Sequence, residues 1–344
     1  MEPFTHTFTS LAIARAGRPR LPRFGTIMLV VAGLAPDLDY ASYFGGADAF
    51  MRFHRTVLHS FAGVIALSCA VAGMFCLMDR KFPARKTSIT VSPGPLKFLA
   101  ALIVCLAGTI GHVLLDLASG VGVQLLWPFH VHWSAWNLVT DFSPWILLFL
   151  VAGLLLPLLF QLVNEEVGER RKNRGVGRAA IVTLMVSAAY LGACAHFRGQ
   201  AVDTLLSHEY HERSPLSAGA FPVTSTPFDW RGVVVTDDTL EEVEVPLGAG
   251  DKFDPDSSLT RYKPPESAAL SLGEKNALTS EYLTYARFPL ASVERVEDDY
   301  RFEVHDLQFA PDDTGPSNIF VRIDFTSGLQ IRREGLHFAS APNP

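Results

Sequence analysis

The sequence predicts a mainly α, polytopic membrane domain followed by a small, mostly β domain outside the membrane. Hydrophobic residues make up 49% of the 344 residues, a high share for a soluble protein. Most of them lie before residue 198, in runs of about 20 residues, the length of a membrane-spanning helix. Beyond that point charged residues, prolines and glycines increase and long apolar runs stop. We therefore expect a helical membrane domain at 1–198, a linker at 199–229 and a mostly β domain at 230–344.

Five to six hydrophobic helices account for the first domain. Four segments have the length and composition of spanning helices: Leu58–Met78, Leu96–Ala118, Pro144–Val163 and Ala179–Phe197. Thr26–Phe44 is a fifth candidate, interrupted by Pro36 and two aspartates. Thr5–Ala16 is too short to cross alone, so we expect it to insert partially.

Basic residues gather in three places and predict the orientation of the spans. The three clusters are Arg15, Arg18, Arg20 and Arg23; then Arg80, Lys81, Arg85, Lys86 and Lys97; then Arg170, Arg171, Lys172, Arg174 and Arg178. Loops rich in Lys and Arg face the cytoplasm. We expect a multi-pass protein of the inner (cytoplasmic) membrane, with the loop Ser119–Ser143 and the C-terminal domain on the extracytoplasmic side.

The outer loop carries several large aromatic side chains, namely Trp127, Phe129, Trp133 and Trp136. Such residues favour the boundary between lipid headgroups and hydrocarbon, so an interfacial aromatic belt is the leading interpretation. A substrate-binding lip is the alternative. The four cysteines lie inside the spans with no Cys-x-x-Cys pair, which favours a packing role for them.

Short segments rich in β-branched and aromatic residues predict the strands of the last domain. They are Trp230–Thr236, Leu283–Phe288, Tyr300–Val304, Leu307–Phe309 and Phe320–Phe325. Turn-forming residues separate them, as at Pro311–Pro316, and Gly248–Pro265 has the composition of a loop. The sequence shows no basic nucleic-acid patch and no Gly-rich phosphate loop.

His112 and Asp116 are the most informative polar residues of the spans. They are four positions apart, so on a helix they share one face. Ionisable groups in a hydrophobic segment are unfavourable unless they are paired. The two could pair with each other, or they could bind a metal, because imidazole and carboxylate are good ligands for Zn²⁺.

Further groups of the same kind occur in other segments. They are His6, Asp37, Asp39, His54, Arg55 and His59, and all but His6 lie near the outer ends of their spans. Pro36 should break its helix so that the two aspartates converge, and a helix starting near Arg55–Leu58 would place Arg55 and His59 on one face. Singly, each has an ordinary explanation, such as a helix cap, a hydrogen-bonded pair or an arginine reaching the headgroups. Together they favour a shared divalent metal site.

Four motifs in this order resemble those of the bacterial YdjM-type membrane-bound metal-dependent hydrolases. The motifs are Thr5-His6, Gly33-Leu34-Ala35-Pro36-Asp37-Leu38-Asp39, His54-Arg55-Thr56-Val57-Leu58-His59-Ser60 and Gly111-His112-x-x-x-Asp116, followed by Gly122–Phe129. The resemblance covers roughly residues 1–200. The family is similar in turn to zinc-dependent phospholipase C and the P1-type nucleases, in which a His-x-x-x-Asp pair helps to hold zinc ions, and His112 and Asp116 match that pair.

The resemblance implies a hydrolase that uses a divalent metal, with Zn²⁺ expected, to activate water against a phosphate ester. The expected metal ligands are His6, Asp37, Asp39, His54, His59, His112 and Asp116. Asp37 or Asp39 would act as general base, and Arg55 would steady the phosphate oxygens. Because the site lies at the membrane surface, membrane lipid or another amphiphilic phosphate compound is the expected partner.

Two other classes of function remain open. Buried carboxylates and imidazoles also occur along ion or proton paths of transporters, although no repeat relates the two halves of this chain. A non-catalytic membrane scaffold, whose β domain binds a partner, is the third reading. The sequence does not predict an oligomeric state.

Overall fold

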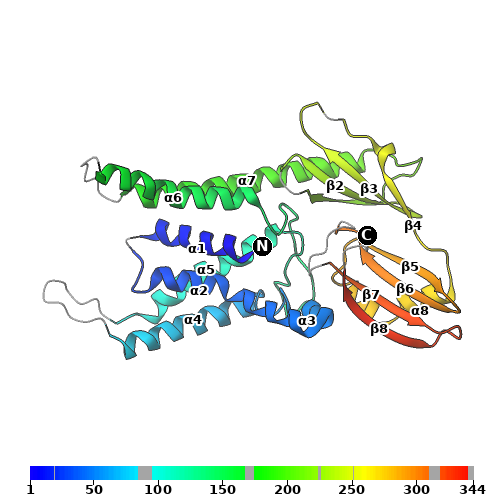
Figure 1. Ribbon diagram of the computed structural model, residues 1–344, viewed down its shortest axis with the longest axis horizontal. Helices are drawn as coiled ribbons and strands as arrows, with labels where there is room; N and C mark the ends of the chain where they lie inside the picture. The colour runs from blue at the N-terminus through cyan, green and yellow to red at the C-terminus, as the bar shows by residue number, and fades with distance from the viewer. Residues whose placement is uncertain are drawn as a thin grey trace.

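Long helices lie side by side at one end of the molecule and two β-sheets lie at the other (Figure 1). The computed structural model describes residues 1–18, 20–83, 95–166, 174–223, 226–250, 252–309 and 318–339. The helices of the first part are α1 (Pro3–Gly17), α2 (Gly25–Leu34), the 3₁₀ helix η1 (Pro36–Gly45), α3 (Gly46–Phe53), α4 (Phe61–Lys81), α5 (Phe98–Ala118), α6 (Pro144–Glu166) and α7 (Arg174–Leu206).

Among the described residues, five helical segments are long and apolar enough to cross a membrane. They are Gly25–Phe53, Phe61–Lys81, Phe98–Ala118, Pro144–Leu162 and Gly177–Leu206. The predicted fold class is therefore confirmed. The short helix α1 packs among them, beside α2, α6 and α7.

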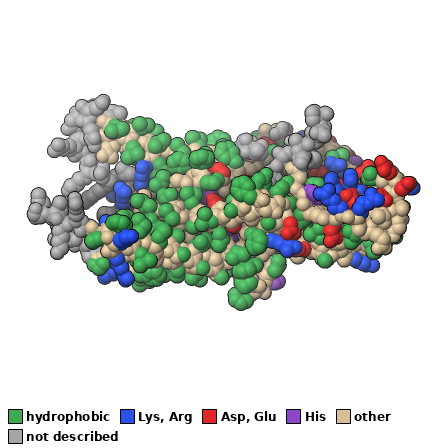
Figure 2. All heavy atoms as spheres, turned by 60° about the horizontal axis from the view of Figure 1, so that its bottom comes forward, with side chains coloured by type: hydrophobic (Ala, Val, Ile, Leu, Met, Phe, Trp, Pro, Cys, Tyr) green, Lys and Arg blue, Asp and Glu red, His purple; other side chains and the backbone are tan. Residues whose placement is uncertain are grey.

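Hydrophobic side chains cover the helical part, and Lys and Arg side chains gather at its end away from the sheets (Figure 2). That end carries the last residues of α1 and α4 and the first residues of α2 and α5. Arg85, Lys86, Arg170, Arg171 and Lys172 of the predicted basic clusters lie outside the described residues, as does the side chain of Arg174.

Close contact between α2 and α5 sets the positions of the predicted metal ligands on α5 and on η1, which follows α2. A Cβ atom on Gly108 of α5 would lie 2.7 Å from the carbonyl oxygen of Leu29, so only glycine fits there. Gly33 packs in the same way against Ser10 of α1, whose Oγ would lie 2.1 Å from an added Cβ. The three helices are thus held together by small residues, as is usual for helix pairs in membranes.

Pro36 ends α2 as expected, because it has no backbone N–H to continue the helical hydrogen bonds. The expected helix start near Arg55–Leu58 is wrong. Helix α4 begins at Phe61, where the Ser60 hydroxyl caps it by accepting a hydrogen bond from the Gly63 N–H at 3.0 Å. Residues 54–60 form a loop in which Arg55 has a left-handed backbone with φ of 57°.

The last part of the chain forms two antiparallel four-stranded sheets. The first has the order β1 (Ser217–Pro222), β2 (Asp229–Val235), β3 (Thr239–Pro246) and β4 (Leu259–Tyr262). The second has the order β5 (Pro289–Val296), β6 (Asp299–Asp306), β7 (Ile319–Phe325) and β8 (Ile331–Phe338). The 3₁₀ helix η2 (Pro255–Ser257) lies between β3 and β4, and α8 (Ala268–Glu274) and α9 (Ala277–Tyr282) lie between β4 and β5 in the chain.

The segment predicted as a linker, 199–229, holds the end of α7 and the strand β1. Strand β1 contains small residues with low strand preference, and its pairing with β2 determines its structure. Leu283–Phe288 and Leu307–Phe309 lie outside the strands, and β4 lies within the predicted loop Gly248–Pro265. The turn predicted at Pro311–Pro316 is outside the described residues.

Each sheet packs on a different part of the helical domain. The first sheet shares a hydrophobic cluster with Ala201 and Leu205 at the end of α7. The second shares a cluster with Phe50 of α3 and with Trp133 of the outer loop. Trp133 is therefore buried in a protein core, and its assignment to an interfacial belt is wrong, whereas Phe129 of the same loop is exposed.

Candidate metal centre

The predicted site residues come from four separate segments that meet at the end of the helical domain nearest the sheets. Helix α1 supplies His6, and η1 supplies Asp37 and Asp39. The loop before α4 supplies His54, Arg55 and His59, and the last two turns of α5 supply His112 and Asp116. All of them except Asp37 are buried.

His112 occupies the centre of the site. Its Nδ1 lies 2.7 Å from the carbonyl oxygen of Gly33. A carbonyl can only accept, so Nδ1 carries the proton and donates, and Nε2 presents a lone pair. This Nε2 lies 3.1 Å from Nε2 of His59 and 3.2 Å from Oδ2 of Asp116.

His59, His112 and Asp116 form a first set of candidate ligands. One donor atom from each lies within 4.8 Å of the other two, and all three residues are buried. Nε2 of His59 is 3.0 Å from Oδ2 of Asp116. Two ring nitrogens and a carboxylate oxygen thus face one another, and unless a proton or a cation lies between them their lone pairs repel.

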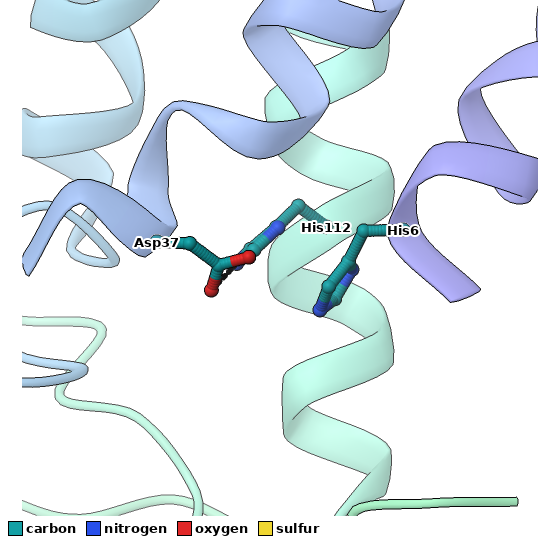
Figure 3. Close-up of side chains that lie close together, drawn as sticks. All are labelled: His6, Asp37 and His112. Atoms are coloured by element: carbon teal, nitrogen blue, oxygen red, sulfur yellow. Dashed lines mark ion pairs between the residues drawn. The ribbon is translucent and has the colours of Figure 1, made fainter. Parts of the chain in front are cut away.

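His6, Asp37 and His112 form a second set with the same spacing limit. Figure 3 shows His6 and Asp37 reaching His112 from opposite sides. The rings of His6 and His112 are stacked with centroids 3.7 Å apart, and Oδ1 of Asp37 lies 3.6 Å from Nε2 of His112. Among the described residues, Nδ1 of His6 and Oδ2 of Asp37 are buried atoms without a hydrogen-bond partner.

Asp39 and His54 stand outside both sets. Oδ1 of Asp39 is 2.9 Å from Nδ1 of His54, and Oδ2 accepts a hydrogen bond from the Arg55 N–H at 2.9 Å. Oδ2 is also 3.0 Å from Nδ1 of His59, on the far side of that ring from His112. Asp39 therefore orients a candidate ligand, as carboxylates behind metal-bound histidines commonly do. Burial lowers the pKa of His54, although the contact with Asp39 acts in the opposite direction. The lowered pKa favours a neutral His54 ring.

Arg55 links the site to the outer loop. Its Nη1 donates to the Ser119 hydroxyl at 3.0 Å, and Nη2 lies 3.3 Å from Asp141 and 3.5 Å from Asp116. Burial lowers the pKa of Arg55, but Asp116 and Asp141 outweigh that effect and raise it, so the guanidinium stays charged. It does not point at a free space as a phosphate clamp would, because both terminal nitrogens already have partners.

Sequence reasoning missed four groups that contact this site. They are Asp141, Ser119, the carbonyl of Gly33 and the amino group of Met1, which contacts Oδ1 of Asp116. Asp141 could have been found, because it is the one acidic residue of the loop Ser119–Ser143. A backbone carbonyl carries no sequence signal of its own.

The donor set fits a divalent cation with mixed nitrogen and oxygen ligands. Three imidazoles and two carboxylates suit Zn²⁺ and similar ions better than Mg²⁺ or Ca²⁺, which prefer oxygen alone. A cation would also satisfy the partnerless atoms of His6 and Asp37. The residues present are therefore compatible with one or more metal ions.

Comparison with known protein families supports this part of the chain as a membrane domain. A family model described as YdjM inner membrane protein matches residues 1–201, which include every residue of both candidate sets. No curated protein and no solved structure matches the chain.

Proposed function

The chain belongs to the family of YdjM inner membrane proteins, and from this premise we propose that it is a membrane-bound, metal-dependent hydrolase of phosphate esters. The observation that carries the proposal is the meeting of His59 Nε2, His112 Nε2 and Asp116 Oδ2 within 3.2 Å of one another in a buried site. When Nδ1 of His112 donates to Gly33, its Nε2 and Oδ2 of Asp116 are both acceptors, and a divalent cation would satisfy them together with Nε2 of His59.

In this proposal His59, His112 and Asp116 would hold a divalent ion such as Zn²⁺. His6 and Asp37 approach the same Nε2 of His112 and would add to that position, because this nitrogen has a single lone pair. A divalent ion bound there would supply Lewis-acid polarisation of the ester and a nucleophilic water near neutral pH. The side chain of Asp37 is 21% exposed, the most of the candidate ligand carboxylates, so Asp37 is the one best placed to take a proton from water. Asp39 is engaged by three partners and keeps a positioning role.

Arg55 supports the same chemistry indirectly. Its guanidinium lies 3.5 Å from Oδ1 of Asp116 and balances the charge of this candidate ligand. Its hydrogen bond to the Ser119 hydroxyl and its ion pair with Asp141 also hold the outer loop beside the candidate ligands.

The surroundings of Asp37 favour an amphiphilic substrate. The neighbouring side chains Leu38 and Phe44 of η1 are 68% and 90% exposed. An apolar surface beside a polar site suits a molecule with a phosphate head and a hydrocarbon tail, such as a membrane lipid. The basic end of the helices lies away from the sheets (Figure 2), which supports a cytoplasmic location for that end and an extracytoplasmic one for the site and the C-terminal domain.

The ion-transport alternative has less support. The described candidate ligands all lie at one end of the helices, and toward the other end the described buried acidic group is Asp79, which pairs with Arg23. A transport path needs polar groups along the whole depth of the membrane.

The test is metal content and hydrolysis of the full-length protein purified in detergent. Wild type should retain Zn²⁺ and hydrolyse a phosphate ester, and H112A should lose both, because His112 belongs to both sets. H130A is the matched control, since His130 is exposed. Wild type without metal, or H112A with unchanged metal, would exclude the metal centre. Retained metal with no hydrolysis of phosphomonoesters, phosphodiesters or phospholipids would exclude the activity alone.

A further inference from the structure

The contact between the second β-sheet and the outer loop lies directly behind the candidate metal centre. Arg287, in the turn before β5, crosses from the C-terminal domain into this loop. Its Nη1 donates to the carbonyl oxygen of Gly120 at 3.0 Å and to Oδ1 of Asn137 at 2.7 Å, and its Nη2 donates to the carbonyl oxygen of Val121 at 3.3 Å. One guanidinium thus binds three acceptors of the helical domain.

The turn that carries Arg287 is itself held in place. The buried carboxylate of Asp306 accepts hydrogen bonds from the backbone N–H groups of Arg287 and Phe288, both at 2.9 Å, and from Gln308 at 3.0 Å. The guanidinium is therefore attached to the rigid end of β6 rather than to a free loop.

Hydrogen bonds continue from Gly120 to the metal centre. The preceding residue, Ser119, donates its hydroxyl hydrogen to the carbonyl oxygen of Asp116 at 2.8 Å and accepts from Nη1 of Arg55 at 3.0 Å. Arg55 then lies against Asp116 and Asp141. Only Ser119, its neighbouring backbone and Arg55 separate the C-terminal domain from a candidate ligand.

A second route runs through aromatic rings. Phe338 of β8 packs against Phe50 of α3 with centroids 5.7 Å apart, and Phe50 stacks on His54 at 4.3 Å. His54 contacts Asp39, which stands behind His59. The C-terminal domain therefore supports the positioning groups of both His59 and Asp116.

We propose that Arg287 is a positioning residue of the metal centre, through which the C-terminal domain sets the orientation of Arg55 and Asp116. The proposal rests on the proposed function, because it needs a metal to be held. It gives the C-terminal domain a role inside the site. Arg287 adds to the hydrogen bonds that hold this loop within the helical domain, such as those from the Leu138 and Val139 N–H groups to the Ala118 carbonyl oxygen.

The experiment uses the full-length protein in detergent and compares R287M, which keeps the aliphatic stem, with R287K, which keeps one donor. Zn²⁺ affinity is measured by competition with a chelator, and the geometry of the site by the visible spectrum of the Co²⁺ form. R287M should weaken Zn²⁺ binding by about threefold to tenfold, less than the roughly 10–100-fold loss typical of a residue that contacts a ligand directly. It should also alter the Co²⁺ spectrum, which R287K should partly restore.

Two further variants make the test specific. R295M removes an arginine of the same domain whose side chain is 66% exposed, and it should leave affinity and spectrum unchanged. N137G removes the acceptor of Arg287 at a position with φ of 51°, which glycine tolerates. The double variant R287M/N137G should bind Zn²⁺ no more weakly than R287M alone, because both changes remove the same bond.

Hydrogen exchange provides a readout that needs no metal. The amides of residues 117–123 should exchange faster in R287M than in wild type, with the circular dichroism spectrum unchanged. If wild type binds Zn²⁺ and R287M matches it in affinity, spectrum and exchange, the positioning role is wrong and the proposed function stands. If wild type binds no metal, the positioning role and the proposed function are both wrong. If R287M does not fold, R287K and N137G decide, and wild-type behaviour of both would overturn the proposal.

Discussion

Nδ1 of His59 lies 3.0 Å from Oδ2 of Asp39, on the side of the imidazole that faces away from His112. The same carboxylate contacts His54 and the backbone of Arg55. Asp39 thus fixes both the ring that would bind a metal and the loop that carries it.

This arrangement predicts that D39N weakens the metal site without removing it. The amide keeps the size of the carboxylate but loses its charge, so Nε2 of His59 becomes a poorer ligand and its ring less well oriented. Zn²⁺ affinity should fall by about 10–100-fold, while full loading remains possible at high Zn²⁺. Chelator competition measures it, with D48N as control, because Asp48 lies on the surface of α3. Complete loss of binding would make Asp39 a ligand instead.

Arg55 should matter for catalysis more than for metal content. In R55K the ammonium cannot reach Ser119, Asp116 and Asp141 together, because the planar fork of donors is lost. We expect kcat/KM for a phosphate ester to fall by about 10–100-fold, a loss of roughly 1.4–2.8 kcal/mol of transition-state stabilisation, with Zn²⁺ still bound. R52K, at an exposed arginine of α3, serves as the control. Equal activity in R55K and wild type would remove Arg55 from the mechanism.

Gly108 should be intolerant of substitution. The new Cβ in G108A would lie 2.7 Å from the Leu29 carbonyl oxygen and 3.3 Å from Cβ of Ala32, so α2 and α5 must move apart. Overpacking of this kind costs about 1–3 kcal/mol, and it would displace the Gly33 carbonyl from His112. Thermal unfolding in detergent measures the loss. G73A is the matched control, because a Cβ there meets nothing within 4 Å and alanine favours the helix. Equal stability of the two variants would contradict the predicted packing.

Glu303 should make the C-terminal domain sensitive to acid. Its hydrogen bonds to His305 and then to Arg322 outweigh burial and lower its pKa from the usual 4.5 to about 2. A lowered carboxyl pKa stabilises the fold above the unfolded value, so this contribution is complete above about pH 4.5 and is lost as the pH falls toward 2.

The corresponding variant is E303Q, and the measurement is tryptophan fluorescence during urea unfolding between pH 3 and pH 7. E303Q should be less stable than wild type at neutral pH, by about 1–2 kcal/mol once solvent screening of this half-buried group is allowed for, and this difference in unfolding free energy should narrow as the pH falls. E294Q is the control, because Glu294 is exposed on β5. Its difference in unfolding free energy from wild type should not change with pH. If the unfolding free energies of E303Q and wild type differ by the same amount at every pH, Glu303 does not have a lowered pKa in the folded protein.

The sequence predicted what depends on local spacing. The four-residue interval between His112 and Asp116 placed both on one face of α5, and the long apolar runs identified the spans. It could not predict what depends on distant contacts. The left-handed Arg55, the carbonyl of Gly33 at His112, and the separation of Asp39 from the candidate ligands all arise from packing between segments far apart in the chain.

The same limit explains the errors about the outer loop and the last domain. Trp133 has the composition signal of an interfacial residue, but Tyr285 packs edge-on against it with centroids 5.0 Å apart. Strand β1 lacks an alternating pattern strong enough to identify it, and its hydrogen bonds to β2 decide its conformation.

The match to the family model stops at residue 201, yet Phe50, Val121 and Trp133 are buried by side chains that come after it. A polypeptide truncated there would present these three residues to water or lipid, and it would also lack the guanidinium that holds Gly120. Shortened versions of this protein should therefore aggregate more readily, and restoring their solubility would require polar replacements on α3 and the outer loop rather than changes among the helices.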